Sequence, residues 1–512
     1  MILLKNGDLI DGTGGSSRKA DVLIEGQTIQ DVGLLNDVPN AEIIDCSGLA
    51  VCPGFIDVHS HCDLEAIQHR PEKIRQGVTA EVVGNCGFSL FPRLPTDDLA
   101  PTFEIFRDRG ERHWDDAGAW FDDVGKHRSH THVATLTGHS SLRAHVSGMS
   151  ADKLEGSTLR RAEAILAQCL EQGSIGLSTG LNEVPSSYGD LDELVELCRI
   201  VRRYEAFYTS HLRDYKFHII EAVEEALEVG RRAGVPVQLS HLQTVGRRNW
   251  DKMDAVLALV DRAVDEGVNV GIDAYPYLAG SCNLTQLLPV WSLEGGTDAL
   301  LERLSDANTC RRIATETEDN MGNDWEDILL CTVPARDDLV GRTVRDIAAS
   351  RSCSCIETAL DLLVENGARV QIISFNQSEE NLKKVLSHPR TSVITDGLVV
   401  DGLSHPRTFG TYPKFLGEFV REKGWMSLEE AIWKATGLPA QRFGFDGRGV
   451  VATGHFADLV VFSPEHIGTK ATYEHPELAP EGIEHVLVSG RWALQHGEIT
   501  ECLAGTPLRH RG

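Results

Sequence analysis

The sequence predicts an α/β protein. Its parts are a (β/α)₈ TIM-like barrel, a small β-sandwich built from both chain ends, and an insertion between barrel strands seven and eight. Three observations predict this fold. Short apolar runs alternate with longer amphipathic segments through the middle of the chain, both ends carry only short strand-like runs, and one interval in the alternation is much longer than the rest.

The middle of the chain contains eight short apolar runs that we expect to be buried strands. They cover residues 55–58, 80–83, 133–136, 175–178, 206–209, 235–239, 268–273 and 392–395. In the four clearest segments between them, apolar residues recur at a spacing of three and four, which predicts amphipathic helices. These segments are 159–172, 193–204, 219–233 and 253–267. Eight alternations of strand and helix are typical of a (β/α)₈ barrel.

Both chain ends contain short apolar segments separated by turn residues, at 2–4, 21–24 and 41–44 and again at 458–462 and 485–488. We expect them to pair, because either set alone has too few strands to bury a face. The long interval before 392–395 leaves room for an inserted subdomain, with a charged stretch near 316–327 and a strand-like run at 370–375. The predicted boundaries are 1–52 and 441–512 for the sandwich, 53–282 and 366–440 for the barrel, and 283–365 for the insertion.

Composition narrows the class of partner. The formal net charge is -27, and no cluster of Lys and Arg is evident, so a nucleic-acid groove or an anionic membrane surface is not expected. The first six residues lack the pattern of a signal peptide, and no apolar run reaches membrane-spanning length. Twelve scattered cysteines indicate free thiols in a reducing compartment. We therefore expect a cytoplasmic protein.

The first predicted barrel strand is followed by His59 and His61. Residues two apart on a strand project from the same face, so the two imidazoles could bind one metal ion such as zinc. The alternative is a pair of polar residues at an exposed strand end. His-x-His alone does not separate these interpretations.

Four further strand ends carry side chains that can bind or serve a metal. Cys86 follows the second strand, His211 the fifth, His241 the sixth and Asp396 the eighth. Each has an ordinary alternative: a buried thiol, a hydrogen-bonded histidine, or a turn residue before a glycine. Together they favour a zinc site with a carboxylate that accepts a proton, because active sites of such barrels lie at the carboxyl ends of the strands.

Several motifs in order resemble one known family. They are 53–61, Gly84-Asn85-Cys86-Gly87-Phe88-Ser89, Ser240-His241, the Tyr-Pro-Tyr-Leu-Ala-Gly-Ser run at 275–281, Thr395-Asp396-Gly397, and the segment 405–411. With matching segments near both ends of the chain, the sequence resembles the D-aminoacylases, the N-acyl-D-amino acid deacylases of the amidohydrolase superfamily.

The resemblance implies a tightly held zinc ion bound by Cys86, His211 and His241, and a second metal position at His59 and His61. Many amidohydrolases bridge two metals with a modified lysine. The fourth predicted strand is followed by Thr179-Gly180-Leu181-Asn182, which offers no lysine. The resemblance implies that Cys86 takes the corresponding part.

The resemblance also implies roles in amide hydrolysis. Asp396 would be the general base, and Arg407 would bind the substrate α-carboxylate through its guanidinium. Tyr188, Tyr275 and Ser281 match positions thought to add hydrogen bonds. The alternatives are packing for the tyrosines and a plain surface charge for Arg407.

One residue departs from the pattern. Relatives commonly carry a lysine two residues after the histidine at 241, and this chain has Gln243. A neutral amide favours substrates with a neutral or hydrophobic side chain over N-acyl-D-glutamate. Two other functions stay open: hydrolysis of a cyclic amide, hydantoin-like ring or dipeptide on the same centre, and a catalytically silent barrel that serves as a scaffold. The insertion is interpreted as a lid over the barrel mouth.

Overall fold

Parallel strands form the centre of the computed structural model, which describes residues 1–68, 70–95, 99–105 and 112–510. Their bounds are β6 (Phe55–Asp57), β7 (Val78–Val83), β8 (His132–Thr135), β9 (Thr137–Gly138), β10 (Gly176–Gly180), β11 (Phe207–His211), β12 (Val237–Leu239), β13 (Val270–Ala274) and β17 (Thr391–Val393). They pair in the orders β6-β7-β8 and β9-β10-β11-β12-β13-β17. Each of the eight predicted strands overlaps an observed one.

Hydrogen bonds connect the two sets of parallel strands. Only Leu136 separates β8 from β9, and its N–H donates to Val83 O at 3.0 Å. At the other side, Asp396 N–H donates to His59 O at 2.9 Å, so the segment after β17 lies beside the segment after β6. This arrangement is consistent with a TIM barrel, and it brings the ends of the first and last strands together.

Amphipathic helices cover the parallel strands. The four predicted helices are observed as α4 (Gly156–Glu171), α5 (Leu191–Arg203), α6 (Ile219–Ala233) and α7 (Met253–Asp265). In α5 the side chain of Asp190 accepts a hydrogen bond from Glu193 N at the first turn, while Leu194, Leu197 and Val201 are buried. The others are α1 (Glu72–Arg75), α2 (Ala117–His127), α3 (His139–Ser147), α12 (Glu379–Ser387), α13 (Arg407–Lys414), the π-helix η9 (Phe415–Glu422), α14 (Leu428–Ala435) and α15 (Gly437–Phe443).

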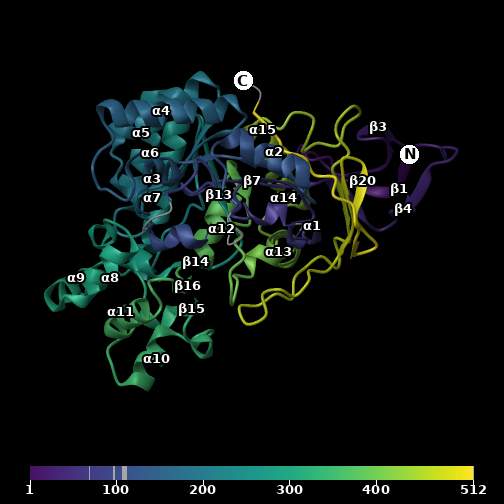
Figure 1. The fold of residues 1–512 in the computed structure, drawn as a ribbon. Helices are drawn as coiled ribbons and strands as arrows, with labels where there is room; N and C mark the ends of the chain where they lie inside the picture. The colour runs from purple at the N-terminus through teal and green to yellow at the C-terminus, as the bar shows by residue number, and fades with distance from the viewer. Residues whose placement is uncertain (69, 96–98, 106–111, 511–512) are drawn as a thin grey trace.

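Both chain ends contribute to one sheet of nine strands, as expected from the short apolar segments that they share. The N-terminal strands are β1 (Ile2–Leu9), β2 (Arg18–Glu25), β3 (Thr28–Gly33), β4 (Glu42–Asp45) and β5 (Ala50–Pro53); the C-terminal ones are β18 (Leu459–Phe462), β19 (Ile483–Val488), β20 (Arg491–Gln495) and β21 (Glu498–Ile499). Antiparallel pairing of β18 with β5 joins the two sets, and Figure 1 shows the purple and yellow ends of the chain side by side. The chain then returns to the barrel, where Leu508 N–H donates to Val133 O at 2.8 Å.

The long interval between β13 and β17 contains a separate lobe, which projects at the lower left of Figure 1. Its antiparallel sheet has the order β14 (Ala279–Asn283), β16 (Gln371–Phe375), β15 (Ile328–Thr332). Its helices are α8 (Thr297–Ser305), α9 (Ala307–Asn320), α10 (Val344–Arg351) and α11 (Cys355–Glu365). β14 ends at the predicted boundary at 283, β16 begins after the predicted boundary at 365, and the two strands pair with each other. The two boundaries stay predictions.

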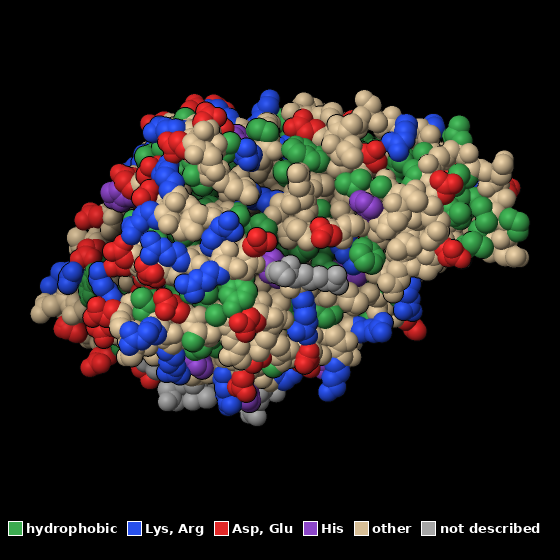
Figure 2. All heavy atoms as spheres, turned by 90° about the horizontal axis from the view of Figure 1, so that it is seen from above, with side chains coloured by type: hydrophobic (Ala, Val, Ile, Leu, Met, Phe, Trp, Pro, Cys, Tyr) green, Lys and Arg blue, Asp and Glu red, His purple; other side chains and the backbone are tan. Residues whose placement is uncertain are grey.

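Charged side chains are unevenly spread over the face drawn in Figure 2. Lys, Arg, Asp and Glu are dense over the barrel helices and the inserted lobe, while the end formed by the nine-stranded sheet is mostly uncharged. Within the described residues, none of the helices is long and apolar enough to cross a membrane.

Candidate active site

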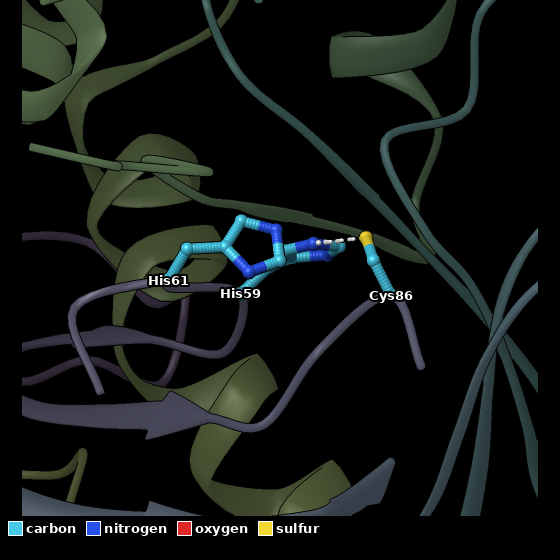
Figure 3. Close-up of side chains that lie close together, drawn as sticks. All are labelled: His59, His61 and Cys86. Carbon is cyan, nitrogen blue, oxygen red and sulfur yellow. Dashed lines mark hydrogen bonds between the residues drawn. The ribbon is translucent and has the colours of Figure 1, made fainter. Parts of the chain in front are cut away.

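The predicted metal ligands meet at the carboxyl ends of the parallel strands. His59 and His61 follow β6, and Cys86 follows β7; Figure 3 shows the His59 ring directed at the Cys86 sulfur. His59 Nε2 lies 3.2 Å from Cys86 Sγ, which is also 3.5 Å from His241 Nε2. The rings of His211 and His241 lie edge to face, with centroids 4.5 Å apart.

These side chains fit a metal centre in two overlapping groups. Ligand atoms of Cys86, His211 and His241 lie within 4.8 Å of one another, and so do those of His59, His61 and Cys86. His59, His241 and Asp396 form a third such set. His211 Nε2 and His241 Nδ1 are buried and have no hydrogen-bond partner among the described residues. Imidazole nitrogens with a thiolate and a carboxylate are the donor set that zinc prefers, and Cys86 is shared between two positions.

The backbone at three of these residues is strained. Cys86, His241 and Asp396 have φ values of 52°, 32° and 47°, in the left-handed region that non-glycine residues seldom occupy. Such conformations cost of order 1–3 kcal/mol each and cluster at functional sites. Here each one turns the chain sharply at the end of a parallel strand, so that the side chain is directed at its neighbours across the strand ends.

Gly180, the last residue of β10, explains how Cys86 comes so close to the fourth strand. A Cβ atom at Gly180 would lie 2.2 Å from Cys86 O, well inside contact distance. The loop that carries Cys86 therefore occupies the space next to the strand whose end offers no lysine. Gly87 also has a positive φ of 81°, and a Cβ there would lie 2.8 Å from Gly180 N.

Charge in the site is balanced among buried groups. Burial alone would raise the pKa of Cys86, but the positive charges of His59 and His61 outweigh it and hold the pKa well below 9.0. Burial alone would lower the pKa of His61, but Cys86 and Asp396 raise it to about 9. Metal binding requires a thiolate and neutral imidazoles, so binding of a divalent cation by these residues is coupled to the release of protons.

Asp396 and Arg407 form a buried ion pair at the edge of the cluster. Arg407 Nη1 lies 2.9 Å from Asp396 Oδ2, while Asp396 Oδ1 lies 3.2 Å from His61 Nε2. Burial alone would raise the pKa of Asp396, but Arg407 holds it well below 3.8. The guanidinium carbon of Arg407 lies 4.6 Å from the centre of the Tyr275 ring, and the backbone N–H of Arg407 donates to His405 Nδ1 at 3.0 Å.

A cavity of about 510 Å³ opens over this cluster. Of the predicted residues, His211, His241, Asp396, Arg407, Tyr275, Gln243 and Ser281 line it. Tyr275 O–H donates to Gln243 Oε1 at 3.2 Å, so the amide that replaces the expected lysine is tied to a neighbouring predicted residue. Residues 287–290 and 320–323 of the inserted lobe form another part of the lining. Tyr188 lies outside this lining, and its buried hydroxyl has no partner among the described residues.

Sequence reasoning missed Asp273, which lies beneath the metal ligands. Its Oδ1 lies 3.3 Å from His59 Nδ1 and accepts the His241 backbone N–H at 2.6 Å. A single carboxylate therefore lies against one imidazole and holds, through a hydrogen bond, the turn that carries another. The signal was present: Asp273 is the last residue of the seventh predicted strand, where a carboxylate has the same significance as Asp396.

Parallel strands with a cysteine–histidine–aspartate cluster at their carboxyl ends define the protein as a metal-dependent amidohydrolase. The comparisons agree. Residues 296–493 match the model of the amidohydrolase family. The chain is 33% identical to D-aminoacylase of Alcaligenes xylosoxydans xylosoxydans over 99% of its own length and 97% of that protein, and 35% identical to the N-acyl-D-glutamate deacylase of the same organism over 96% and 92%.

Solved structures give the same result. The N-acyl-D-glutamate deacylase of Bordetella bronchiseptica, complexed with zinc and a phosphonate inhibitor, matches with a TM-score of 0.87, 32% identity and 99% of each chain covered. The D-hydantoinase of Thermus sp. matches with a TM-score of 0.58, 100% of this chain and 99% of that chain covered, and 17% identity, which supports the fold alone. The chain belongs to the D-aminoacylase family, the N-acyl-D-amino acid deacylases of the amidohydrolase superfamily.

Proposed function

We propose that this protein hydrolyses the amide bond of N-acyl-D-amino acids to a D-amino acid and a carboxylate, with neutral or hydrophobic side chains favoured. One zinc ion would be held tightly by Cys86, His211 and His241, with a second, weaker position at His59 and His61. Bound zinc supplies Lewis acidity and activates water at neutral pH. The observation that carries the proposal is the convergence of these ligands with Asp396 under one cavity.

The residues of the chain divide the remaining work. Asp396 would take the proton of the attacking water and return it to the leaving nitrogen, a task that suits a buried carboxylate with one oxygen directed at the ligand cluster. Arg407 lines the same cavity, and we assign it the substrate α-carboxylate, with Tyr275 and Ser281 adding hydrogen bonds. Tyr188 is the weakest of these assignments, because it does not line the cavity.

The preference for neutral side chains is supported by the cavity lining. Gln243 offers an amide where the family resemblance leads us to expect a lysine, and Leu287, Leu288 and Met321 add apolar surface from the inserted lobe. An apolar wall stabilises an apolar substrate side chain by roughly 25 cal/mol per Å² removed from water. The proposal therefore ranks N-acetyl-D-methionine and -leucine above N-acetyl-D-glutamate.

The proposal is tested by zinc quantification together with a panel of paired D- and L-N-acyl amino acids. The expected result is about one tightly bound zinc ion per chain and hydrolysis of D-substrates only. A hydantoin ring and a dipeptide belong in the panel, because a higher kcat/KM on either one would favour the other amidohydrolase reaction. A protein without bound zinc and without activity would support the silent scaffold.

A further inference from the structure

Lys216 is a basic side chain of the active-site cavity to which the site described above assigns no role. Lys216 lies in the loop after β11, and the Lys and Arg residues of the described lining are Arg213, Lys216 and Arg407. Arg213 Nε lies 2.9 Å from Glu225 Oε2, and Arg407 is paired with Asp396. Lys216 has no ion pair within 4.0 Å among the residues that the structure describes. Among the described lining residues, Lys216 is therefore the Lys or Arg side chain that has no carboxylate partner in the protein.

The nearest acid in sequence is already engaged. Asp214 accepts the backbone N–H of Lys216 through Oδ1 and that of His218 through Oδ2, both at 2.8 Å. These bonds fix the turn that presents Lys216. They direct the carboxylate toward the backbone, at more than ion-pair distance from the ammonium.

The side chain of Lys216 is held in place by the inserted lobe. A Cβ at Gly322 would lie 3.3 Å from Lys216 Cγ and Cδ, so the aliphatic stem packs beside Gly322, where a larger residue would crowd it. The backbone at Gly322 is itself closely packed against Gly246, because a Cβ at Gly246 would lie only 2.1 Å from Gly322 O. Burial lowers the pKa of Lys216, opposed by Asp214 and Cys282. A ligand carboxylate beside the ammonium would offset this cost.

We infer that Lys216 binds a second carboxylate of the substrate, in addition to the α-carboxylate assigned to Arg407. The inference rests on the proposed function and deepens it. The carboxylate has two sources: the side chain of the amino acid, as in N-acetyl-D-glutamate, or the acyl group, as in N-succinyl-D-methionine. Both present the same chemistry to an ammonium, and N-acetyl-D-methionine is the matched substrate that lacks it.

The test compares kcat/KM of wild type and Lys216→Met, loaded with zinc, on these three substrates. A hydrogen bond to a charged group predicts a loss of roughly tenfold or more on a dicarboxylate and a change within about threefold on N-acetyl-D-methionine. Lys216→Arg should keep most of the dicarboxylate rate, since it keeps the charge. Lys470→Met, which removes an exposed lysine paired with Glu481 on the nine-stranded sheet side of the chain, is the charge-matched control and should change none of the three.

The outcomes separate the alternatives. A selective loss on N-acetyl-D-glutamate assigns the carboxylate to the side chain and overturns the neutral preference drawn from Gln243; a selective loss on N-succinyl-D-methionine assigns it to the acyl group and leaves that preference standing. An equal loss on all three substrates, or none, overturns the inference. Should Lys216→Met lower Tm or zinc content, Lys216→Gln is measured instead under the same criteria. A zinc-loaded wild type that hydrolyses none of the three refutes the proposed function itself.

Discussion

Gly180→Ala adds a single methyl group, and we predict that it damages the metal centre. The added Cβ would lie 2.2 Å from Cys86 O, whereas Cβ contacts shorter than 3.0 Å are essentially not observed, so the atoms must separate by at least 0.8 Å (3.0 − 2.2). The methyl group meets backbone, which cannot rotate away, and the strain falls on the residue that bridges the two ligand groups. A displacement near 1 Å at reacting groups costs on the order of 10²-fold in rate.

The assay measures kcat/KM on N-acetyl-D-methionine, zinc per chain and Tm. We expect kcat/KM to fall roughly 10²-fold with partial loss of zinc, and stability to fall by about 1–3 kcal/mol from overpacking. Gly468→Ala is the matched control, because a Cβ at Gly468 meets nothing within 4 Å. If Gly180→Ala keeps its zinc and a kcat/KM within about threefold of wild type, the argument that Gly180 makes room for Cys86 is refuted.

Three further predictions test other parts of the structure. Asp396→Asn should lower kcat by roughly 10³-fold or more with zinc retained at Cys86, since it removes the proton acceptor and not the thiolate; a rate within tenfold of wild type would contradict its role. Asp273→Asn should weaken metal binding at His59 by about 10–100-fold, measured by titration of the apo protein, because the amide removes the negative charge beside the imidazole. Burial lowers the pKa of Lys434 from 10.5 to about 8, so the unfolded chain binds the proton more tightly between these values. The free energy of unfolding of the wild type, relative to that of Lys434→Met, should therefore increase by roughly 2 kcal/mol between pH about 7 and about 9.5. Chemical unfolding at each pH measures it, and a difference that stays constant with pH would show that burial does not destabilise the charged form of Lys434.

Much of the barrel and most of the site could be predicted because both depend on local pattern. Apolar runs mark strands, and parallel strands place their carboxyl ends together, so His59, Cys86, His211, His241 and Asp396 are brought into one cluster by topology alone. The pairing of β14 with β16, the return of the C-terminal tail to Val133 and the wall formed by 320–323 depend instead on contacts between segments far apart in sequence. No period in the sequence encodes them.

Lys216 illustrates what the motif comparison left out. The motif comparison considers one position after one strand, and there Gln243 provides no cation. The cavity, however, responds to charge in space, and a lysine after the neighbouring strand β11 reaches the same lining. Because function depends on the site and not on the fold, every charged side chain that reaches the cavity bears on the choice of substrate, and position 243 is only one of these places.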